Sequence, residues 1–349
     1  MSMKDEVKQL ALSQGAQLVG VARVEAYGEY LAEVEGRLQD TGAGLDDFMI
    51  SPAAGIPEAR DKTFFACLAD ARKTLAEAKT IVLLGVYAYD EAALYRNTRQ
   101  ELRAKTARVY SYYPVARQIA ERVAGFIEAR GHRAVQGQHV PLKFVADRIG
   151  MGAYGRNGVL QTEQYGSYVA LRSILTDLEL APDRFGRVST RCEECGRCMK
   201  ACPTGALYAP YKVNPALCIN PITRRDRYIE PPLRSKMQNW IHGCDICQEV
   251  CPANKDLPVR QTDRRAGFDP GHHASHRHLE GLERTPNLLA LLCANQPKII
   301  RRNAAIALGN IGKANKAVLP ALKEQLGGMS SGLKEYFVWA ITQLEERER

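Results

Sequence analysis

The residues in this sequence that are best suited to chemistry are its cysteines. Eight of the ten lie between residues 192 and 251 and form two motifs, Cys192-x2-Cys195-x2-Cys198-x3-Cys202-Pro203 and Cys244-x2-Cys247-x3-Cys251-Pro252, with Cys218 between them. Gaps of two residues let one tight turn point three thiolates at a single iron–sulfur cube, while the cysteine before each proline ligates the other cube. The spacing therefore predicts two 4Fe–4S clusters.

The same rule predicts which thiols share a cluster. One cluster takes Cys192, Cys195, Cys198 and Cys251, and the other takes Cys202, Cys218, Cys244 and Cys247. This is the arrangement of a bacterial-type two-cluster ferredoxin module. Zinc is the alternative, but zinc sites usually show two separated Cys or His pairs and not a run of three followed by Cys-Pro. We expect the two remaining cysteines, Cys67 and Cys293, to be ordinary buried thiols.

A glycine-rich stretch is the best candidate for the place where the electrons are used. Gly150–Gly158 holds four glycines in nine residues, and backbone without side chains can approach a large cofactor closely. The spacing does not match a dinucleotide-binding fingerprint. The glycines are equally compatible with a purely structural turn. His139 and Asp147 are the ionisable residues of interest just before this stretch.

The elements expected before the cysteines form one α+β domain over residues 1–180. Apolar residues recur at helical spacing in three segments, and short apolar runs typical of strands occur in four. The expected helices cover residues 4–12, 114–130 and 142–149, and the expected strands cover 17–22, 79–87, 159–162 and 168–175.

The remaining chain divides into a cysteine-rich part and a helical part. Residues 181–265 show little regular pattern, as a ferredoxin-like domain would. Amphipathic helices are expected at 301–312, 317–326 and 333–344. We interpret residues 281–349 as a short HEAT-like helical repeat array, which must pack on the rest of the chain because it is too short to stand alone.

Charge and hydropathy limit the class of protein. No apolar run approaches the length of a membrane span, and the start of the chain does not resemble a secretory signal, so we expect a cytoplasmic protein without a membrane partner. The net charge is +9. Residues 1–180 carry 22 basic and 22 acidic residues, whereas residues 181–349 carry 26 and 17.

The basic C-terminal half suits a polyanionic partner such as nucleic acid, although it also offsets the charge of anionic clusters. If the partner is RNA, Lys298, Arg301 and Arg302 are the expected phosphate contacts at the start of one helix.

Several segments, taken in order, resemble the epoxyqueuosine reductase family, which is related to the reductive dehalogenases. The segments that carry the resemblance span nearly the whole chain: Ala71–Val82, Val140–Gly152, Gly155-Arg156-Asn157, Ser173–Leu178, Ala201–Ala206, Arg224-Arg225, Gly243–Pro252, Arg302–Asn310 and Trp339-Ala340. The cysteine motifs alone would indicate only a ferredoxin. The glycine turn and the helical tail make the resemblance specific.

The resemblance implies a cobalamin on the N-terminal domain, fed with electrons by the nearer cluster, and a substrate that is the epoxyqueuosine of tRNA. It also implies an external electron donor such as flavodoxin or ferredoxin, and we expect a monomer. The residues expected at the corrin are Arg156, Asn157, Gly158, Asn220 and Asp245.

One position departs from the family pattern. The family's acid, three residues before the proline that corresponds to Pro141, is Gln138 here, and a glutamine has no proton to give. Tyr113, Tyr154 and His139 are the candidate replacements. The departure leaves two alternatives open: a corrinoid and iron–sulfur reductase of another small molecule, and an electron-transfer protein that reduces a partner's corrinoid.

Overall fold

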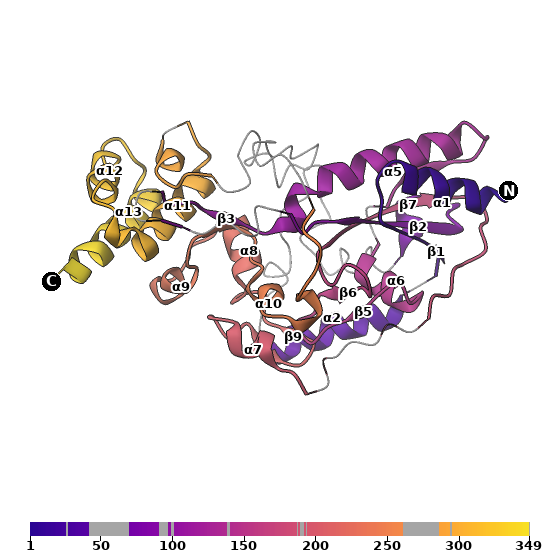
Figure 1. Cartoon of the computed structure of the whole chain (residues 1–349), viewed down its shortest axis with the longest axis horizontal. Helices are drawn as coiled ribbons and strands as arrows, with labels where there is room; N and C mark the ends of the chain where they lie inside the picture. Colours follow the sequence, from indigo (N-terminus) through magenta and orange to yellow (C-terminus); the bar gives the residue numbers. More distant parts are fainter. Residues whose placement is uncertain are drawn as a thin grey trace.

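The computed structural model describes most of the 349 residues. The described residues are 1–25, 27–41, 70–90, 97–98, 101–137, 140–186, 188, 192, 194–260, 286–293 and 295–348. The N-terminal sheet, the cysteine-rich elements and the C-terminal helices follow one another along the long axis of the molecule (Figure 1).

The N-terminal part is built on an antiparallel sheet with strand order β1-β2-β7-β4. Its strands are β1 (Leu18–Arg23), β2 (Thr80–Tyr87), β7 (Val169–Thr176) and β4 (Ala134–Gln136). Every residue of β2 is buried. A strand that is apolar throughout needs cover on both faces, which confirms the prediction of a buried central strand for this run.

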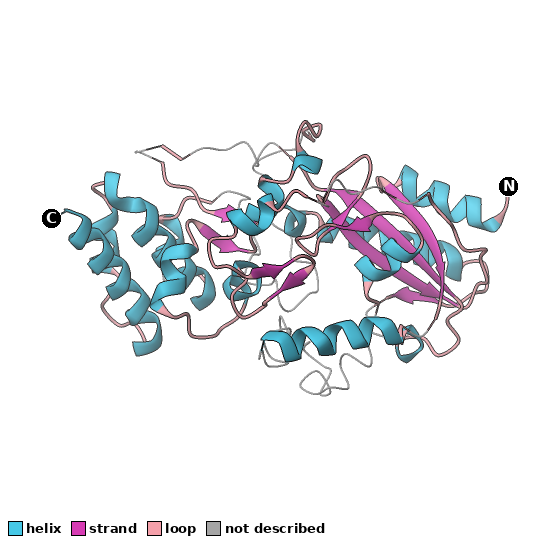
Figure 2. Cartoon of the chain, turned by 90° about the horizontal axis from the view of Figure 1, so that it is seen from below, coloured by secondary structure: helices cyan, strands magenta, loops and turns pink. Residues whose placement is uncertain are grey.

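Helices cover the two faces of this sheet (Figure 2). On one face α1 (Met3–Ser13) and α5 (Tyr113–Glu128) pack through apolar residues such as Val7, Ile119 and Val123. On the other face α6 (Leu142–Arg148) packs with the short helix η2 (Ala71–Lys73).

The three helices expected before residue 180 are confirmed. Pro114 lies in the first turn of α5, and Gly131 follows the helix with a φ of 84°, which favours glycine. Helix α2 (Gly28–Thr41) was not predicted. Few of its residues are buried, Val34 among them, although Tyr30, Leu31, Val34 and Leu38 recur at helical spacing and could have marked it.

Short elements connect the sheet to the cysteine-rich part. A two-stranded hairpin of β5 (Ala153–Tyr154) and β6 (Leu160–Gln161) encloses the glycine turn. Upstream, β3 (Lys105–Thr106) and the single turn η4 (Arg108–Ser111) lead into α5, and β3 pairs in parallel with β10. The cysteine-rich elements are α7 (Arg197–Ala201), β8 (Leu207–Ala209), β9 (Lys212–Val213), α8 (Ile219–Arg224), α9 (Pro231–Lys236), β10 (Trp240–His242), α10 (Ile246–Glu249) and η5 (Pro252–Asn254).

The C-terminal part is helical, as expected. It contains η7 (Ala290–Leu292), α11 (Lys298–Ile311), η8 (Gly312–Ala314), α12 (Val318–Glu324) and α13 (Ser331–Glu348). Helix α11 is buried along most of its length between α13 and β10. The apolar core around α11 also includes Leu102, Ala104 and Ala107 from the N-terminal half. The tail is therefore anchored on the chain before it.

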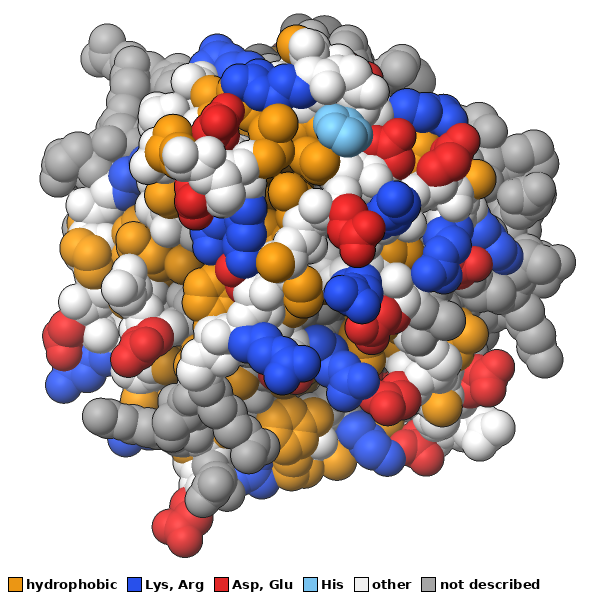
Figure 3. All heavy atoms as spheres, turned by 90° about the vertical axis from the view of Figure 1, so that its right-hand side faces the viewer, with side chains coloured by type: hydrophobic (Ala, Val, Ile, Leu, Met, Phe, Trp, Pro, Cys, Tyr) orange, Lys and Arg blue, Asp and Glu red, His pale blue; other side chains and the backbone are white. Residues whose placement is uncertain are grey.

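The end of the molecule that carries the N-terminal sheet shows basic and acidic side chains interspersed over its surface (Figure 3). This agrees with the equal numbers of basic and acidic residues in the first 180 positions. Among the described residues, no helix combines the length and the apolar character that crossing a membrane requires.

Candidate functional site

Four of the predicted cluster ligands meet in one pocket. It is lined by Cys192, Cys195, Cys198 and Cys251, together with residues of the glycine turn. The backbone N–H of Cys195 donates to the Cys192 carbonyl at 3.2 Å, and Gly196 takes a left-handed φ of 60° before α7. This turn points the thiols of Cys192, Cys195 and Cys198 in one direction. Cys251, just before η5, supplies the fourth thiol.

The other four thiols are positioned by different element ends. Cys202 follows α7, Cys218 precedes α8, and Cys244 and Cys247 lie before and within α10. Burial raises the pKa of Cys218 to about 11, and nearby Cys202 adds to the effect. Burial also raises the pKa values of Cys244 and Cys247, with Cys218 contributing to each. Thiolates in such a site need a bound cation to be stable at neutral pH.

One thiol of this second group differs. The pKa of Cys202 is lowered, because hydrogen bonds from the Thr204 hydroxyl and from backbone N–H groups outweigh the effect of burial. The Thr204 hydroxyl lies 3.5 Å from its sulfur. Hydrogen bonds of this kind are typical around iron–sulfur clusters.

The thiol spacing fits clusters better than a single ion. Over the described part of the chain, no three His, Cys, Asp or Glu side chains converge as ligands of one metal ion. Zinc would draw its sulfurs to within about 2.3 Å of one centre, whereas a cube holds them farther apart. The donor sets therefore fit two clusters, in the grouping that the Cys-Pro rule predicts; the individual ligand assignments stay predictions.

The glycine turn forms one wall of the first thiol pocket. Arg156 and Asn157 line it, and Arg156 donates to the Cys192 carbonyl at 3.2 Å. Asn157 is only 4% exposed, and its Nδ2 atom has no hydrogen-bond partner among the described residues. Gly158 has a φ of 71°. A buried amide donor beside side-chain-free backbone fits a bound ligand that carries hydrogen-bond acceptors.

Asn220 and Tyr113, predicted from different parts of the chain, are linked through Tyr110. The Tyr110 hydroxyl donates to Asn220 Oδ1 at 2.7 Å and accepts from Arg224 at 2.7 Å. The rings of Tyr110 and Tyr113 meet edge to face with their centroids 5.6 Å apart, and the Arg172 guanidinium lies 5.5 Å from the Tyr113 centroid.

Tyr154, another candidate proton donor, is not in this group. The backbone N–H of Tyr154 donates to the Asp147 carboxylate at 3.2 Å, and the Lys143 ammonium lies 5.7 Å from its ring centroid. Gln138 and His139 lie outside the described residues.

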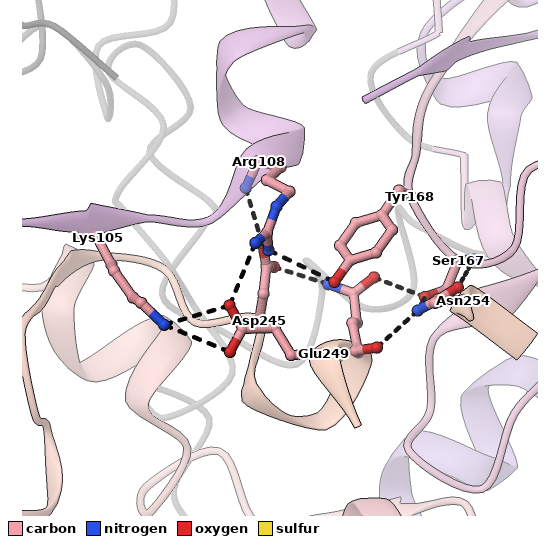
Figure 4. A network of polar contacts seen from close by, with 8 residues as sticks. Lys105, Arg108, Ser167, Tyr168, Asp245, Glu249 and Asn254 are labelled. Atoms are coloured by element: carbon pink, nitrogen blue, oxygen red, sulfur yellow. Dashed lines mark hydrogen bonds and ion pairs between the residues drawn. The ribbon is translucent and has the colours of Figure 1, made fainter. Parts of the chain in front are cut away.

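Asp245 belongs to a buried polar network (Figure 4). Its Oδ2 atom accepts from the Arg108 guanidinium at 2.8 Å and from the Arg108 backbone N–H at 2.9 Å. Gln248 donates to Oδ1 at 2.8 Å, and Arg108 also reaches Tyr168 and Glu249. Burial raises the pKa of Asp245, and Arg108 partly offsets that effect.

This network joins the N-terminal half to the cluster segment. Sequence reasoning missed Arg108 and Tyr168 of this network and Gln161 of the first thiol pocket, because a single polar residue carries no motif or periodicity.

Two predictions from the basic tail and the spare thiols are wrong. Arg302 is 1% exposed and cannot contact a phosphate; its guanidinium donates to the carbonyls of Ile222, Arg225 and Arg227. Burial lowers the pKa of Arg302 to about 10. Cys293 is exposed and not buried, while Cys67 lies outside the described residues.

Comparison with known proteins agrees with this site. Residues 191–254 match the family described as a 4Fe-4S double cluster binding domain, so the two-cluster module is established. The chain is 32% identical over 283 residues to the epoxyqueuosine reductase of Burkholderia pseudomallei, which covers 72% of this chain and 68% of the relative. The chain belongs to the epoxyqueuosine reductase family.

The share of each sequence that aligns differs among members of the family. The epoxyqueuosine reductase of Bacillus subtilis is 33% identical over 190 residues, and this match spans 52% of the chain and about half (49%) of the relative.

Solved epoxyqueuosine reductase structures share the fold over nearly the whole chain. The Bacillus subtilis enzyme, with its catalytic aspartate loop swung out of the active site, superposes with a TM-score of 0.78 at 24% identity, covering 98% of this chain and 90% of that one. A second structure, with an epoxyqueuosine-modified tRNA-Tyr stem loop, gives a TM-score of 0.71 at 22% identity, covering 98% and 99%. The mixed α and β fold is thus that of the epoxyqueuosine reductases.

Proposed function

We propose that this chain is a cobalamin- and iron–sulfur-dependent reductase that converts epoxyqueuosine to queuosine in tRNA. Membership of the epoxyqueuosine reductase family carries this proposal, and the two groups of four thiols support it. The overall reaction removes the epoxide oxygen as water and forms a carbon–carbon double bond. It consumes two electrons and two protons.

The two clusters would pass electrons one at a time from an external donor such as flavodoxin or ferredoxin. Cys192, Cys195, Cys198 and Cys251 would hold one, and Cys202, Cys218, Cys244 and Cys247 the other. The first group shares its pocket with Arg156 and Asn157, two of the expected cobalamin contacts. In the second group, burial raises the pKa values of Cys218, Cys244 and Cys247, so these three thiols need a bound cation to ionise.

Cobalamin, when bound, supplies a cobalt centre that can be reduced and that drives loss of the epoxide oxygen. We propose Arg156, Asn157, Gly158, Asn220 and Asp245 as its contacts. The Asn157 Nδ2 atom, which has no hydrogen-bond partner among the described residues, supports this role. Asp245 would act mainly by holding Arg108, since both of its oxygens already accept hydrogen bonds.

The proton for the departing oxygen must come from a residue other than Gln138. Tyr113 is our first candidate, because its ring packs against the ring of Tyr110. The Tyr110 hydroxyl in turn donates a hydrogen bond to the proposed cofactor contact Asn220. Tyr154 and His139 are the alternatives. A positioned general acid contributes about 10²–10⁴-fold to such a step.

The tRNA would lie on the helical tail, which we interpret as HEAT-like repeats. Exposed lysines on and near its helices, such as Lys313, Lys316 and Lys334, are the proposed phosphate contacts in place of Arg302. A substrate of this kind would place the enzyme in the cytoplasm, and we propose that it works as a monomer.

The test is conversion of epoxyqueuosine-containing tRNA by anaerobically reconstituted protein, followed by mass spectrometry of the nucleosides. We expect slow turnover by the wild type, faster turnover by Gln138→Asp, and at least 10²-fold slower turnover by Tyr113→Phe in the wild-type background. Tyr165→Phe, which alters a tyrosine packed elsewhere against Tyr87, is the matched control.

Gln138 also favours a second candidate, a corrinoid reductase of another small molecule. No conversion by either the wild type or Gln138→Asp, with both clusters and cobalamin bound, would overturn the tRNA proposal. Binding of the tRNA stem loop, measured in the same preparation, separates a tRNA-acting enzyme from the two alternatives. A small-molecule reductase or an electron-transfer protein would not bind the stem loop.

A further inference from the structure

A buried amide from the N-terminal half reaches the first group of thiols. Gln161, on β6, is 3% exposed. Its Nε2 atom lies 3.5 Å from the Cys251 sulfur and 3.7 Å from the Cys192 sulfur. In the described part of the chain, the hydrogen-bond partners of this carboxamide are cysteine sulfurs alone. Its Nε2 atom donates to Cys251 and Cys192, and the Cys192 thiol donates to its Oε1 atom at 3.9 Å.

The glycine turn makes room for this amide. A Cβ atom at Gly155 would lie 2.4 Å from Gln161 Nε2, which is closer than real side chains approach. The backbone of Gly155 has an ordinary φ, so the glycine matters here for the space that it leaves to the Gln161 amide. The pairing of Gln161 with Ala153 fixes the position of the Gln161 side chain along the β5–β6 hairpin.

The sulfurs are good partners for this amide only as thiolates. A neutral thiol is a weak acceptor, and a buried donor without a good acceptor costs free energy. A thiolate ligand of a cluster accepts a stronger, charge-assisted bond. When the cluster gains one electron, negative charge on its sulfurs increases and the bond strengthens. Hydrogen bonds to ligand sulfurs therefore make a cluster easier to reduce.

We propose that Gln161 raises the reduction potential of the cluster held by Cys192, Cys195, Cys198 and Cys251 by donating hydrogen bonds to two of its ligands. The N-terminal half thereby adjusts a cluster whose four ligands all lie in the following segment. The proposal rests on cluster binding and not on the substrate, so it stands or fails independently of the tRNA reaction.

The test is a redox titration of both clusters, followed by EPR, with dithionite as the electron source. Gln161→Met keeps the length of the side chain and removes its N–H groups. We expect about a tenfold change in the oxidised-to-reduced ratio of one cluster at a given potential, in favour of the oxidised form, while the other cluster is unchanged. For a one-electron couple this is a shift of about 59 mV to lower potential.

The matched control is Gln17→Met. The carboxamide of Gln17 is likewise hydrogen-bonded, in this case to backbone groups of Gly15 and Tyr87. Gln17 lies at the edge of the sheet and not in the thiol pocket. The Gln17→Met variant should leave the reduction potentials of both clusters unchanged.

A measurement on the unaltered protein covers the case in which Gln161→Met fails to bind the first cluster. Protein with ¹⁵N in the glutamine side chains should show, by pulsed EPR, coupling between a side-chain nitrogen and one reduced cluster. Absence of that coupling would overturn the proposal. So would unchanged potentials in Gln161→Met, or an equal shift of both clusters, which would indicate a general structural change.

Discussion

The N-terminal sheet and the cluster segment, residues 192–254, are stabilised in different ways. In the sheet, β2 and β7 each have eight residues and bury apolar side chains on both faces. In the cluster segment the longest described helices have six residues and the strands two or three. Helices shorter than about 12 residues are marginal by themselves. The sheet thus has a core of its own. In the cluster segment, α8 and β10 join the core of the C-terminal helices, whereas the short elements around the thiols depend on their ligands.

The largest effect should come from removing the clusters. Chelation of iron from anaerobically prepared protein should abolish most amide protection in residues 192–218 and 243–254, because thiols without metal no longer hold these short elements together. The amides of β2 and β7 should keep their protection. Hydrogen exchange read by mass spectrometry measures both regions in one sample. Equal loss in the sheet would remove the distinction between the two regions.

A single substitution should separate the two clusters. Cys195→Ser should reduce the iron content from about eight to about four per chain, because it disables only the first group. Cys293→Ser, at an exposed cysteine outside both groups, should change nothing.

The reverse experiment damages the sheet and spares the clusters. Leu84→Ala removes a fully buried side chain of β2 and should lower the free energy of unfolding of the sheet by about 2–5 kcal/mol. Iron content, measured at the same temperature, should stay at the wild-type value. Loss of iron in this variant would mean that the cluster segment needs the sheet as strongly as it needs its ligands.

Arg108 tests how strongly the two regions are joined. Arg108→Met leaves the Asp245 carboxylate buried without its cation and should cost about 3–5 kcal/mol in a denaturant titration. The double variant Arg108→Met with Asp245→Asn should cost less than the sum of the single changes, because it removes both charges. Strict additivity of the two single effects would show that the ion pair is not a joint between the regions.

A smaller effect with a defined pH dependence is expected at Asp183. Its carboxylate pairs with Lys4 and Lys8 at 2.6 and 3.0 Å and accepts the Val21 backbone N–H at 2.9 Å. Burial opposes ionisation, but these three partners outweigh it and lower the pKa of Asp183. Asp183→Asn should lower the free energy of unfolding at pH 7 by about 1–2 kcal/mol.

The sign of the pH dependence follows from the lowered pKa. The stabilisation is complete above the unfolded-state pKa of about 3.9 and is lost as the pH falls through the lower pKa of the folded state. The difference between wild type and Asp183→Asn should therefore shrink below pH 4 in thermal melts. A constant difference down to pH 2 would exclude ionisation of Asp183 as its source.

Much of this protein could be predicted from its sequence. Cysteine spacing alone indicates two clusters, because ligand geometry around a cube fixes local gaps of two and three residues. Helix α5 and strand β2 follow from apolar periodicity, which reflects one helical face and one buried strand. Helix α2, in contrast, was missed although Tyr30, Leu31, Val34 and Leu38 recur at helical spacing.

The roles of single polar residues were decided by the tertiary structure. In the sequence Arg302 is a candidate RNA contact, yet the fold buries it, and its guanidinium donates to three backbone carbonyls. Gln161 lies in no motif, and only the pairing of β5 with β6 brings its amide to sulfurs that follow it by 31 and 90 positions. The sequence determined which ligands are present and which segments are apolar, since both are local properties. The fold alone determined which distant hydrogen-bonding partners meet, since that choice has no period along the chain.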